Sequence, residues 1–432
     1  MAADSDCDVA VIGAGLAGLG AATHLRRAGL RCVVLEAADR IGGRAWTVAA
    51  EPLGGVWFDM GAVWLHDAEN NPLVPIAEAA GETLLRSDAL RTERTYIGQR
   101  LATAAETADY DAAWRRFEVA ADRLIAAQGD VALSDVTRSL SDDPWAPTVE
   151  AWEGPVICVA DADRFSALDW RRNALGGSNL VPEGGIGAFV ARHLGRGLDV
   201  RLNTPVRRVR WQGPGGRVEV MTDRGTLSAD ACIVTVSTGV LAAGTLAFEP
   251  ALPPTTQAAI AQLPMGLAIK VALRAVGADR LDLPMHCSVD GQVPRSGGHL
   301  MPFQCWPFGR DYVQGWIGGS IASDLARAGE AAIVDHALGQ LRALFGGRVD
   351  SLFGGGAHLI TRWDADPWVL GAYSYPGPHD ADARYRLAEP VGDGHLLFAG
   401  EACNTPYAGT VAGAWISGQD AAADVLRQRR TD

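Results

Sequence analysis

The stretch Asp8-Val-Ala-Val-Ile12-Gly13-Ala-Gly15-Leu-Ala-Gly18 decides the fold of this chain. Its apolar run up to Ile12 is typical of a strand buried on both faces of a parallel sheet. The glycines follow at the spacing G-x-G-x-x-G. Gly13 permits a tight turn, Gly15 lets the backbone approach a pyrophosphate, and Gly18 lets a helix pack on the strand. Apolar residues then recur at helical spacing as far as Ala28-Gly29.

A second apolar run, Cys32-Val-Val-Leu35, ends in Glu36. This acid stands about 20 residues after the glycines, where it can accept hydrogen bonds from a ribose diol. The N-terminus of the intervening helix offers unpaired N–H groups and the positive end of a dipole to phosphates. Because all these parts occur in order, the sequence predicts an α/β fold with a Rossmann-like dinucleotide-binding domain. The alternative is a glycine-rich turn without a ligand.

Composition excludes several other classes. The chain has 432 residues, of which 48% are hydrophobic and 21% charged, so we expect two or three packed units and no disorder. A net charge of −13 disfavours nucleic acid and anionic membranes as partners. No apolar run is long enough to cross a bilayer, and the N-terminal residues carry no export pattern. We therefore expect a cytoplasmic location.

The cysteines and histidines give no sign of a metal site. The seven cysteines are scattered and form no Cys-x-x-Cys pair, and the nine histidines lack metal-ligand spacing. This pattern predicts buried thiols in a reducing compartment and no bound metal.

Lys270 is the only lysine in a chain with 38 basic residues. It lies in an apolar stretch, residues 264–273. A strand with period two would place Ala268, Lys270 and Ala272 on one face, leaving room beside the amine for a ligand or water. The alternative is a lysine whose stem packs on apolar surface while its ammonium reaches solvent.

Further motifs extend the nucleotide-binding pattern. Arg44 closes the stretch 36–44 as a fork donor for phosphate. The pair Gly61-Ala62 would let backbone lie against a planar ring, a buried run ends in Glu401, and Thr410-Val411 opens a helix with small residues on one side. With the blocks 179–185, 202–206, 234–241, 248–253 and 361–367, the chain resembles the flavin-containing amine oxidases. These include monoamine oxidases, polyamine and spermine oxidases and lysine-specific histone demethylases, and the polyamine-oxidase-like branch is the most similar.

The resemblance implies an FAD cofactor with defined contacts. Glu36 would hold the adenosine ribose, Arg44 the pyrophosphate, the Val206 backbone the adenine, Glu401 the ribityl chain, and the N–H groups near Val411 the flavin pyrimidine edge. Two positions depart from the family. Ala38 replaces a frequent arginine, which removes one phosphate contact. Ala372 stands where monoamine oxidases attach flavin through cysteine, so we expect noncovalent FAD.

The resemblance also implies the catalytic residues. Lys270 matches the lysine that contacts flavin N5 through a water. Trp363 and Tyr373 match aromatic residues that flank the flavin and confine the substrate amine. Thr410 stands where monoamine oxidases place a second tyrosine, and His66 matches a histidine of polyamine oxidases that would orient the substrate.

The predicted function is an FAD-dependent amine oxidase. It would oxidise a primary or secondary amine, with polyamines among the candidates, to an imine and then an aldehyde while O₂ is reduced to H₂O₂. The acids Glu150, Glu153, Asp161 and Asp163 are candidates to attract a distal ammonium.

Several alternatives stay open. The first is an L-amino acid oxidase, which would need an arginine in the cavity to bind the substrate carboxylate. A biosynthetic flavin oxidase and a noncatalytic protein with the nucleotide fold are the others. Histone demethylation has no support, because no chromatin-binding domain is recognisable.

The predicted domains are discontinuous. Residues 1–84, 177–265 and 376–432 would form the FAD-binding domain. Residues 85–176 and 266–375 would form an α+β substrate-binding domain, with the active site at the junction. We predict a helix around Tyr110–Leu124, strands around Lys270 and 312–317, and a helix over 331–344. The oligomeric state stays open.

Overall fold

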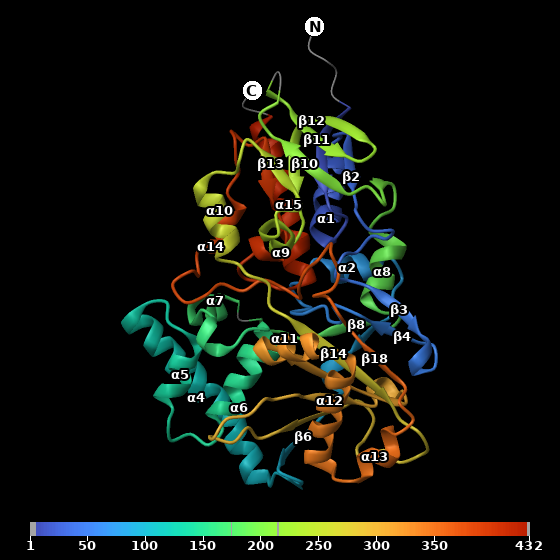
Figure 1. The fold of residues 1–432 in the computed structure, drawn as a ribbon, viewed down its shortest axis with the longest axis vertical. Helices are drawn as coiled ribbons and strands as arrows, with labels where there is room; N and C mark the ends of the chain where they lie inside the picture. Colours follow the sequence, from blue (N-terminus) through green and yellow to red (C-terminus); the bar gives the residue numbers. More distant parts are fainter. Residues whose placement is uncertain (1–5, 174, 214–215, 430–432) are drawn as a thin grey trace.

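The computed structural model describes residues 6–173, 175–213 and 216–429. Its elements fall into two regions built around two sheets (Figure 1). One region contains the first sheet with helices α1 and α15. The other contains the second sheet with helices α11 to α13, and a group of covering helices that includes α4 to α6 lies beside it.

The first sheet is largely parallel and has the order β13-β10-β11-β12-β1-β2-β9, with β19 also pairing with β12. Strand β12 pairs in parallel with β1 and β19 and in antiparallel with β11. The predicted strands at 8–12 and 32–35 are confirmed as β1 and β2. The bounds are β1 Cys7–Ile12, β2 Cys32–Leu35, β9 Asp199–Arg201, β10 Val206–Arg210, β11 Val218–Thr222, β12 Gly225–Val234, β13 Ala247–Glu249 and β19 Leu396–Phe398.

Helices α1 (Leu16–Arg27) and α15 (Val411–Gln428) come from distant parts of the chain and pack against each other beside this sheet (Figure 1). Small residues make this packing close, since a Cβ on Gly418 would lie 2.0 Å from the carbonyl oxygen of Ala17. The apolar core under these helices includes Val9, Leu19 and Trp415. The opposite face of the sheet packs against α10 (Pro254–Ala261) and α14 (Ala383–Ala388).

The second sheet has the order β18-β14-β17-β16-β15-β6-β7. On strand β14, Ile269 and Val271 are buried in a core shared with Ile333 and Leu341 of α12, so the predicted period of two is confirmed. Lys270 therefore points away from that core. The bounds are β6 Thr92–Ile97, β7 Arg100–Leu101, β14 Ala268–Arg274, β15 Cys287–Gly291, β16 Phe303–Cys305, β17 Tyr312–Gly318, β18 His358–Ile360, α11 Gly319–Ala328, α12 Glu330–Phe345 and α13 Arg348–Phe353.

The covering helices begin with α4 (Ala104–Gln128), which confirms the helix predicted around Tyr110–Leu124. Thr103 and Glu106 form a capping box at its start. A π-helix, Trp152–Cys158, continues directly from α6, and π-helices are frequent at functional sites. The other covering helices are α5 Leu133–Ser139, α6 Ala146–Ala151, the 3₁₀ turn Ala162–Arg164 and α7 Ala167–Arg172.

The remaining elements are short. They are β3 Thr47–Ala50, β4 Val56–Asp59, β5 Leu84–Arg86, β8 Leu180–Pro182, α2 Leu73–Ala79, α3 Ser87–Leu90, α8 Ile186–His193, α9 Thr238–Ala242 and the 3₁₀ turns Glu51–Leu53, Pro307–Gly309 and Glu401–Cys403. Strands β6 and β7 share a sheet with β14 to β18, as a joint substrate-binding domain would require. The domain boundaries themselves stay a prediction.

Two features are absent from the described residues. None of their helices has the length and apolarity needed to cross a membrane. These residues also contain no group of three or more His, Cys, Asp or Glu side chains that could hold a metal ion.

Candidate active site

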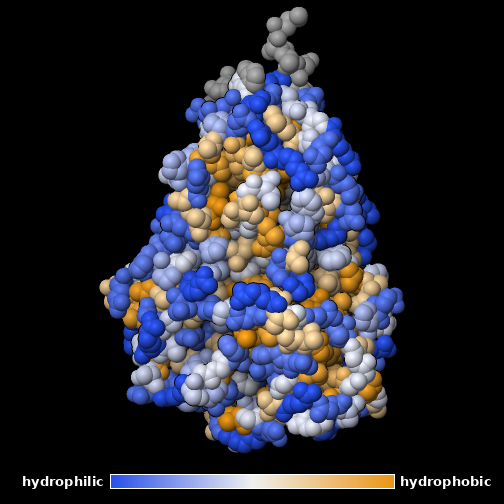
Figure 2. Space-filling view, viewed as in Figure 1, coloured by the Kyte–Doolittle hydropathy of each residue, from blue (hydrophilic) through white to orange (hydrophobic). Residues whose placement is uncertain are grey.

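A cavity of about 710 Å³ extends from the glycine loop after β1 to the side of the second sheet that carries Lys270. Apart from Gly18 and three of the four candidate acids, every residue predicted for cofactor or substrate lines it, so segments far apart in the sequence meet there. On the face shown in Figure 2, one group of apolar residues lies over the region of α9 and α10, and further apolar patches lie among hydrophilic residues in the lower half.

The glycine loop has the geometry that a pyrophosphate needs. Gly13 has a φ of +102°, which favours glycine, and a Cβ on Gly18 would lie 1.9 Å from the carbonyl oxygen of Gly13. By contrast, a Cβ on Gly15 would meet nothing within 4 Å, because Gly15 faces the open cavity. Helix α1 begins directly afterwards and directs its first N–H groups to this space.

Glu36 is buried at the end of β2 and fixes the glycine loop. Its carboxylate accepts hydrogen bonds from the backbone N–H of Ala14 at 2.6 Å and of Ala38 at 2.8 Å. Burial raises the pKa of Glu36, although these two bonds oppose the shift. Val206, at the start of β10, lines the same end of the cavity.

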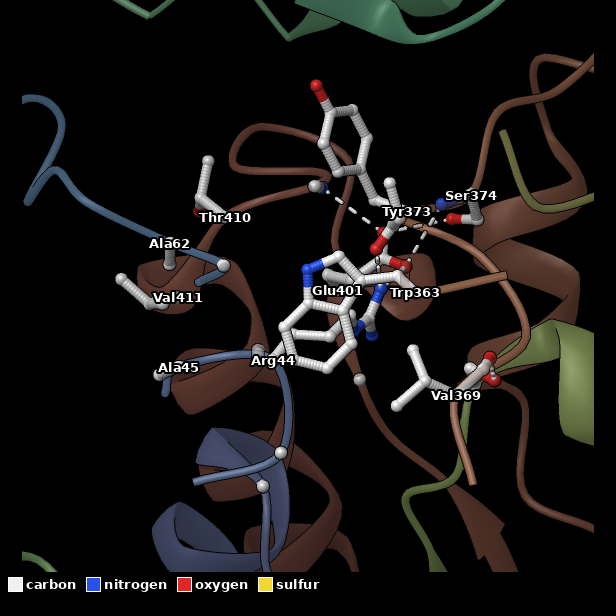
Figure 3. Close-up of a pocket in the computed structure, with 18 of the residues that line it drawn as sticks. Arg44, Ala45, Ala62, Trp363, Val369, Tyr373, Ser374, Glu401, Thr410 and Val411 are labelled. Atoms are coloured by element: carbon white, nitrogen blue, oxygen red, sulfur yellow. Dashed lines mark hydrogen bonds and ion pairs between the residues drawn. The ribbon is translucent and has the colours of Figure 1, made fainter. Parts of the chain in front are cut away.

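Arg44 and Glu401 meet in the middle of the cavity wall (Figure 3). Arg44 Nη1 lies 3.0 Å from Glu401 Oε1 and also donates to the carbonyl oxygen of Ala372 at 2.7 Å. The Glu401 carboxylate accepts further bonds from Ser374 N at 3.0 Å, Ser374 Oγ at 2.9 Å and Gly409 N at 3.2 Å. The predicted phosphate and ribityl contacts thus lie in one polar network.

Lys270 lies on the cavity face of β14 and is only 8% exposed. Its Nζ donates to the carbonyl oxygen of Asp59 at 2.8 Å and to that of Gly61. Burial lowers its pKa from 10.5 to about 8, and the nearby carboxylate of Asp59 opposes this shift. The alternative of an ammonium reaching solvent is therefore wrong.

Trp363 packs against the segment that holds Lys270. Its indole Nε1 donates to the carbonyl oxygen of Met60 at 3.0 Å, and its ring meets Trp46 edge-on at 6.2 Å. Gly61 must be glycine, because a Cβ there would lie 1.7 Å from the carbonyl oxygen of Arg44. In Figure 3, the indole of Trp363 projects between Ala62 and Val369.

Tyr373 and Thr410 are both engaged by neighbouring backbone. The Tyr373 hydroxyl donates to the carbonyl oxygen of Ile157 in the π-helix, and its ring lies against Gly409, where a Cβ would be 3.1 Å away. Thr410 caps α15: its hydroxyl donates to Tyr407 O at 2.7 Å and accepts from Gly413 N at 3.0 Å. Helix α15 thus begins at Val411, as predicted, and the catalytic role of Thr410 stays a prediction.

His66 lines the cavity with a defined tautomer. Asn179 Nδ2 donates to the carboxylate of Asp88, so its Oδ1 faces His66 Nδ1, at 2.6 Å. Nδ1 must then carry the proton, which leaves the lone pair of Nε2 as an acceptor. Burial lowers the pKa of His66, which favours this neutral form.

Sequence reasoning missed several cavity residues. Trp316 is the cross-strand neighbour of Lys270 in the β14–β17 pair, and its ring lies 5.8 Å from that of Trp64. The alternation of β17 could have indicated this position once the strand pairing was known. Arg384 and Asp169 also line the cavity, but no local pattern reveals them. Of the four candidate acids, Glu153 alone lines the cavity.

The residues present fit FAD. The open space at Gly15 would take the pyrophosphate, Glu36 and Val206 lie where a nucleoside would bind, and the start of α15 faces the cavity at Val411. Ala372 offers no nucleophile, in agreement with noncovalent binding.

Comparisons with known proteins agree with this geometry. The family model described as "Flavin containing amine oxidoreductase" matches residues 16–118 and 138–426. The chain is 31% identical to probable polyamine oxidase 4 of Arabidopsis thaliana over 97% of this chain and 87% of that protein. It is 27% identical to lysine-specific histone demethylase 1B of Mus musculus, over 95% of this chain and 52% of the demethylase. The solved structure of putrescine oxidase bound to putrescine has a TM-score of 0.79 at 22% identity, over 98% of this chain and 99% of that one, and so shares the fold. This chain therefore belongs to the flavin-containing amine oxidoreductases and is an FAD-dependent amine oxidase of the polyamine-oxidase-like branch.

Proposed function

We propose that this enzyme oxidises a diamine or polyamine. The carbon–nitrogen bond at the reacting amine is converted to an imine, and water hydrolyses the imine to an aldehyde and a smaller amine or ammonia. The two electrons and two protons removed from the substrate reduce O₂ to H₂O₂. FAD, when bound, supplies the electron acceptor for the amine. The names of the polyamine oxidase and putrescine oxidase relatives support this substrate class.

The position of Glu153 carries the proposal. Glu153 lies in the π-helix and lines the cavity, and one carboxylate oxygen accepts a hydrogen bond from Trp170 Nε1 at 2.8 Å. Burial raises its pKa to about 7, and the neighbouring carboxylate of Glu118 adds to the shift. A distal ammonium would neutralise this partly buried carboxylate, so a substrate with a second cationic nitrogen gains more than a monoamine does.

The residues around Lys270 would handle the reacting amine. Trp363, Tyr373 and Trp316 line this part of the cavity and limit the access of water to it. The lone pair of His66 Nε2 is suited to accept a hydrogen bond from a substrate N–H group. Lys270, with a pKa near 8, can hold or release a proton at Nζ under mildly alkaline conditions.

The cavity arginines argue against an amino acid substrate. Those that line the cavity beside the covering helices and the second sheet are already paired with carboxylates: Arg384 with Asp169 at 2.9 Å, Arg171 with Asp122 at 2.6 Å and Arg91 with Glu93 at 3.1 Å. A substrate carboxylate would have to displace one of these internal partners.

We also propose a cytoplasmic location. All seven cysteines are free thiols, as in a reducing compartment.

A substrate panel tests the proposal. Purified FAD-loaded protein would be given linear diamines and polyamines, monoamines of matched length and L-amino acids, with peroxide release and aldehyde formation measured. We expect kcat/KM for the best diamine or polyamine to exceed that of the matched monoamine at least tenfold. Preference for a monoamine or an amino acid would contradict the proposal.

A further inference from the structure

A fully buried ion pair joins the covering helices to the segment beside the cofactor site. Arg384 of α14 and Asp169 of α7 have side-chain exposures of 2% and 1%. The guanidinium forms a fork on the carboxylate, with Nε to Oδ1 at 2.9 Å and Nη2 to Oδ2 at 3.1 Å. The next ion pair of the same helix, Arg172 with Asp382, is exposed.

The contacts of Arg384 continue to Glu401 through Ser374. Arg384 Nη1 donates to Ser374 Oγ at 2.9 Å, and Nη2 donates to the Ser374 carbonyl oxygen at 3.0 Å. Because Ser374 Oγ accepts from a guanidinium, its single proton is directed to Glu401 Oε2, at 2.9 Å. The carboxylate of Glu401 then meets Arg44. The result is a continuous network of hydrogen bonds and ion pairs that begins at Asp169 of α7 and ends at Arg44 in the middle of the cavity wall.

Helix α7 also contacts the substrate side of the cavity and a second loop of the cofactor site. Trp170, next to Asp169, donates to the cavity acid Glu153. Asn173, at the C-terminal end of α7, donates through Nδ2 to the carbonyl oxygen of Ala408 at 3.2 Å, close to the loop that leads into α15. Helix α7, itself one of the covering helices, therefore contacts the cavity acid Glu153, the Glu401 network and the segment before Val411.

We propose that Asp169 and Arg384 are positioning residues that fix Ser374 and Glu401 for FAD, and that they couple the seating of the covering helices to FAD occupancy. The inference rests on the role proposed for Glu401. A buried pair of this kind is seldom needed for stability, because apolar residues of similar volume often replace such a pair without loss. An apolar pair could not orient Ser374 as this ion pair does. Coupling of this kind is reciprocal, so whatever detaches α7 must also weaken FAD binding.

The test uses two perturbations and one control. Asp169→Leu with Arg384→Met removes both charges at similar volume, while Ser374→Ala leaves the ion pair intact and interrupts its path to Glu401. The control, Arg172→Gln with Asp382→Asn, removes the exposed pair of the same helix. Three quantities are measured: FAD affinity by titration of apoprotein, Tm of the apoprotein, and hydrogen exchange over residues 146–172 with and without FAD.

We expect both perturbations to weaken FAD binding at least tenfold and to abolish the protection that FAD confers on residues 146–172. The apoprotein Tm should stay within a few degrees of the wild-type value, and the control should behave as wild type. Wild-type FAD affinity and protection in the Asp169/Arg384 variant would overturn the proposal. Should that variant fail to fold, Ser374→Ala decides: unchanged FAD affinity there refutes the coupling. None of these measurements uses an amine, so they are independent of the substrate proposal.

Discussion

Replacing Lys270 by methionine should lower activity without destabilising the enzyme below pH 8. Methionine matches the lysine stem in length but has no charge and no N–H group. The change removes the two hydrogen bonds from Nζ to the carbonyl oxygens of Asp59 and Gly61. It also removes an ammonium that is buried in the cavity wall.

The expected magnitude follows from the pKa of Lys270. Burial lowers this pKa from 10.5 to about 8, which corresponds to about 3 kcal/mol at roughly 1.4 kcal/mol per tenfold change. The pKa in the folded state is below that in the unfolded chain, so the unfolded chain binds more protons between pH 8 and 10.5. The free energy of unfolding of the wild type should therefore rise with pH across this window. Below pH 8 the gain from removing the ammonium offsets the two lost hydrogen bonds, worth about 1 to 3 kcal/mol each.

The assay is chemical denaturation of apoprotein at pH 7, 8, 9 and 10 for wild type, Lys270→Met and Lys270→Arg. Relative to Lys270→Met, the wild type should gain about 2 kcal/mol between pH 8 and 10, and Lys270→Arg should show no such gain because guanidinium does not titrate there. FAD binding should be retained in Lys270→Met, while amine turnover falls roughly 100-fold or more.

Two results would refute this reasoning. Parallel pH profiles for wild type and Lys270→Met would show that Lys270 is not titrating in a buried site. Near-normal turnover in Lys270→Met would remove the lysine from the reaction, whatever its effect on stability.

Three further predictions concern other parts of the cavity. Glu153→Gln should lower kcat/KM for a diamine roughly 10- to 150-fold, which corresponds to the loss of a hydrogen bond to a charged group. The kcat/KM for a matched monoamine should change by no more than about twofold. An equal loss for both substrates would contradict the distal-ammonium role. Tyr373→Phe loses the hydrogen bond to Ile157, so amide hydrogen exchange should become faster across the π-helix Trp152–Cys158 while FAD stays bound. Unchanged exchange would mean that the Tyr373 hydroxyl does not stabilise this helix. Gly15→Ala should weaken FAD binding at least tenfold but leave the apoprotein Tm unchanged, because the new Cβ would meet open space. Gly18→Ala should instead lower the Tm, because its Cβ would lie 1.9 Å from the carbonyl oxygen of Gly13. Normal FAD affinity in Gly15→Ala would place the pyrophosphate elsewhere.

Much of the fold could be predicted from local sequence patterns. The strands β1 and β2, the start of α15 and the alternation around Lys270 follow from apolar periodicity and glycine spacing, which depend on neighbouring residues alone. The family motifs brought all but one of the predicted site residues to one cavity. What those residues do there stays a prediction.

Other features depend on contacts between distant segments. The pairing of Lys270 with Trp316 is set by strand register, and the fork of Arg384 on Asp169 requires α7 and α14 to meet. A charged residue destined for burial looks the same in the sequence as one destined for solvent. The engagement of Thr410 as a helix cap and of Tyr373 by the π-helix likewise became visible only with the backbone in place.

The packing of α1 on α15 has a consequence for synthesis on the ribosome. The glycine loop and α1 emerge early, but the helix that packs against α1, and the strand β19 that leads to Glu401, emerge only after nearly all the rest of the chain. Until then α1 can pack only against elements made earlier, such as β1 and β2, and the predicted cofactor contacts at Glu401 and the start of α15 are missing. Long-range contacts of this kind slow folding and expose the growing chain to aggregation. Supply of flavin and chaperones late in translation should therefore govern the yield of active enzyme in an expression host.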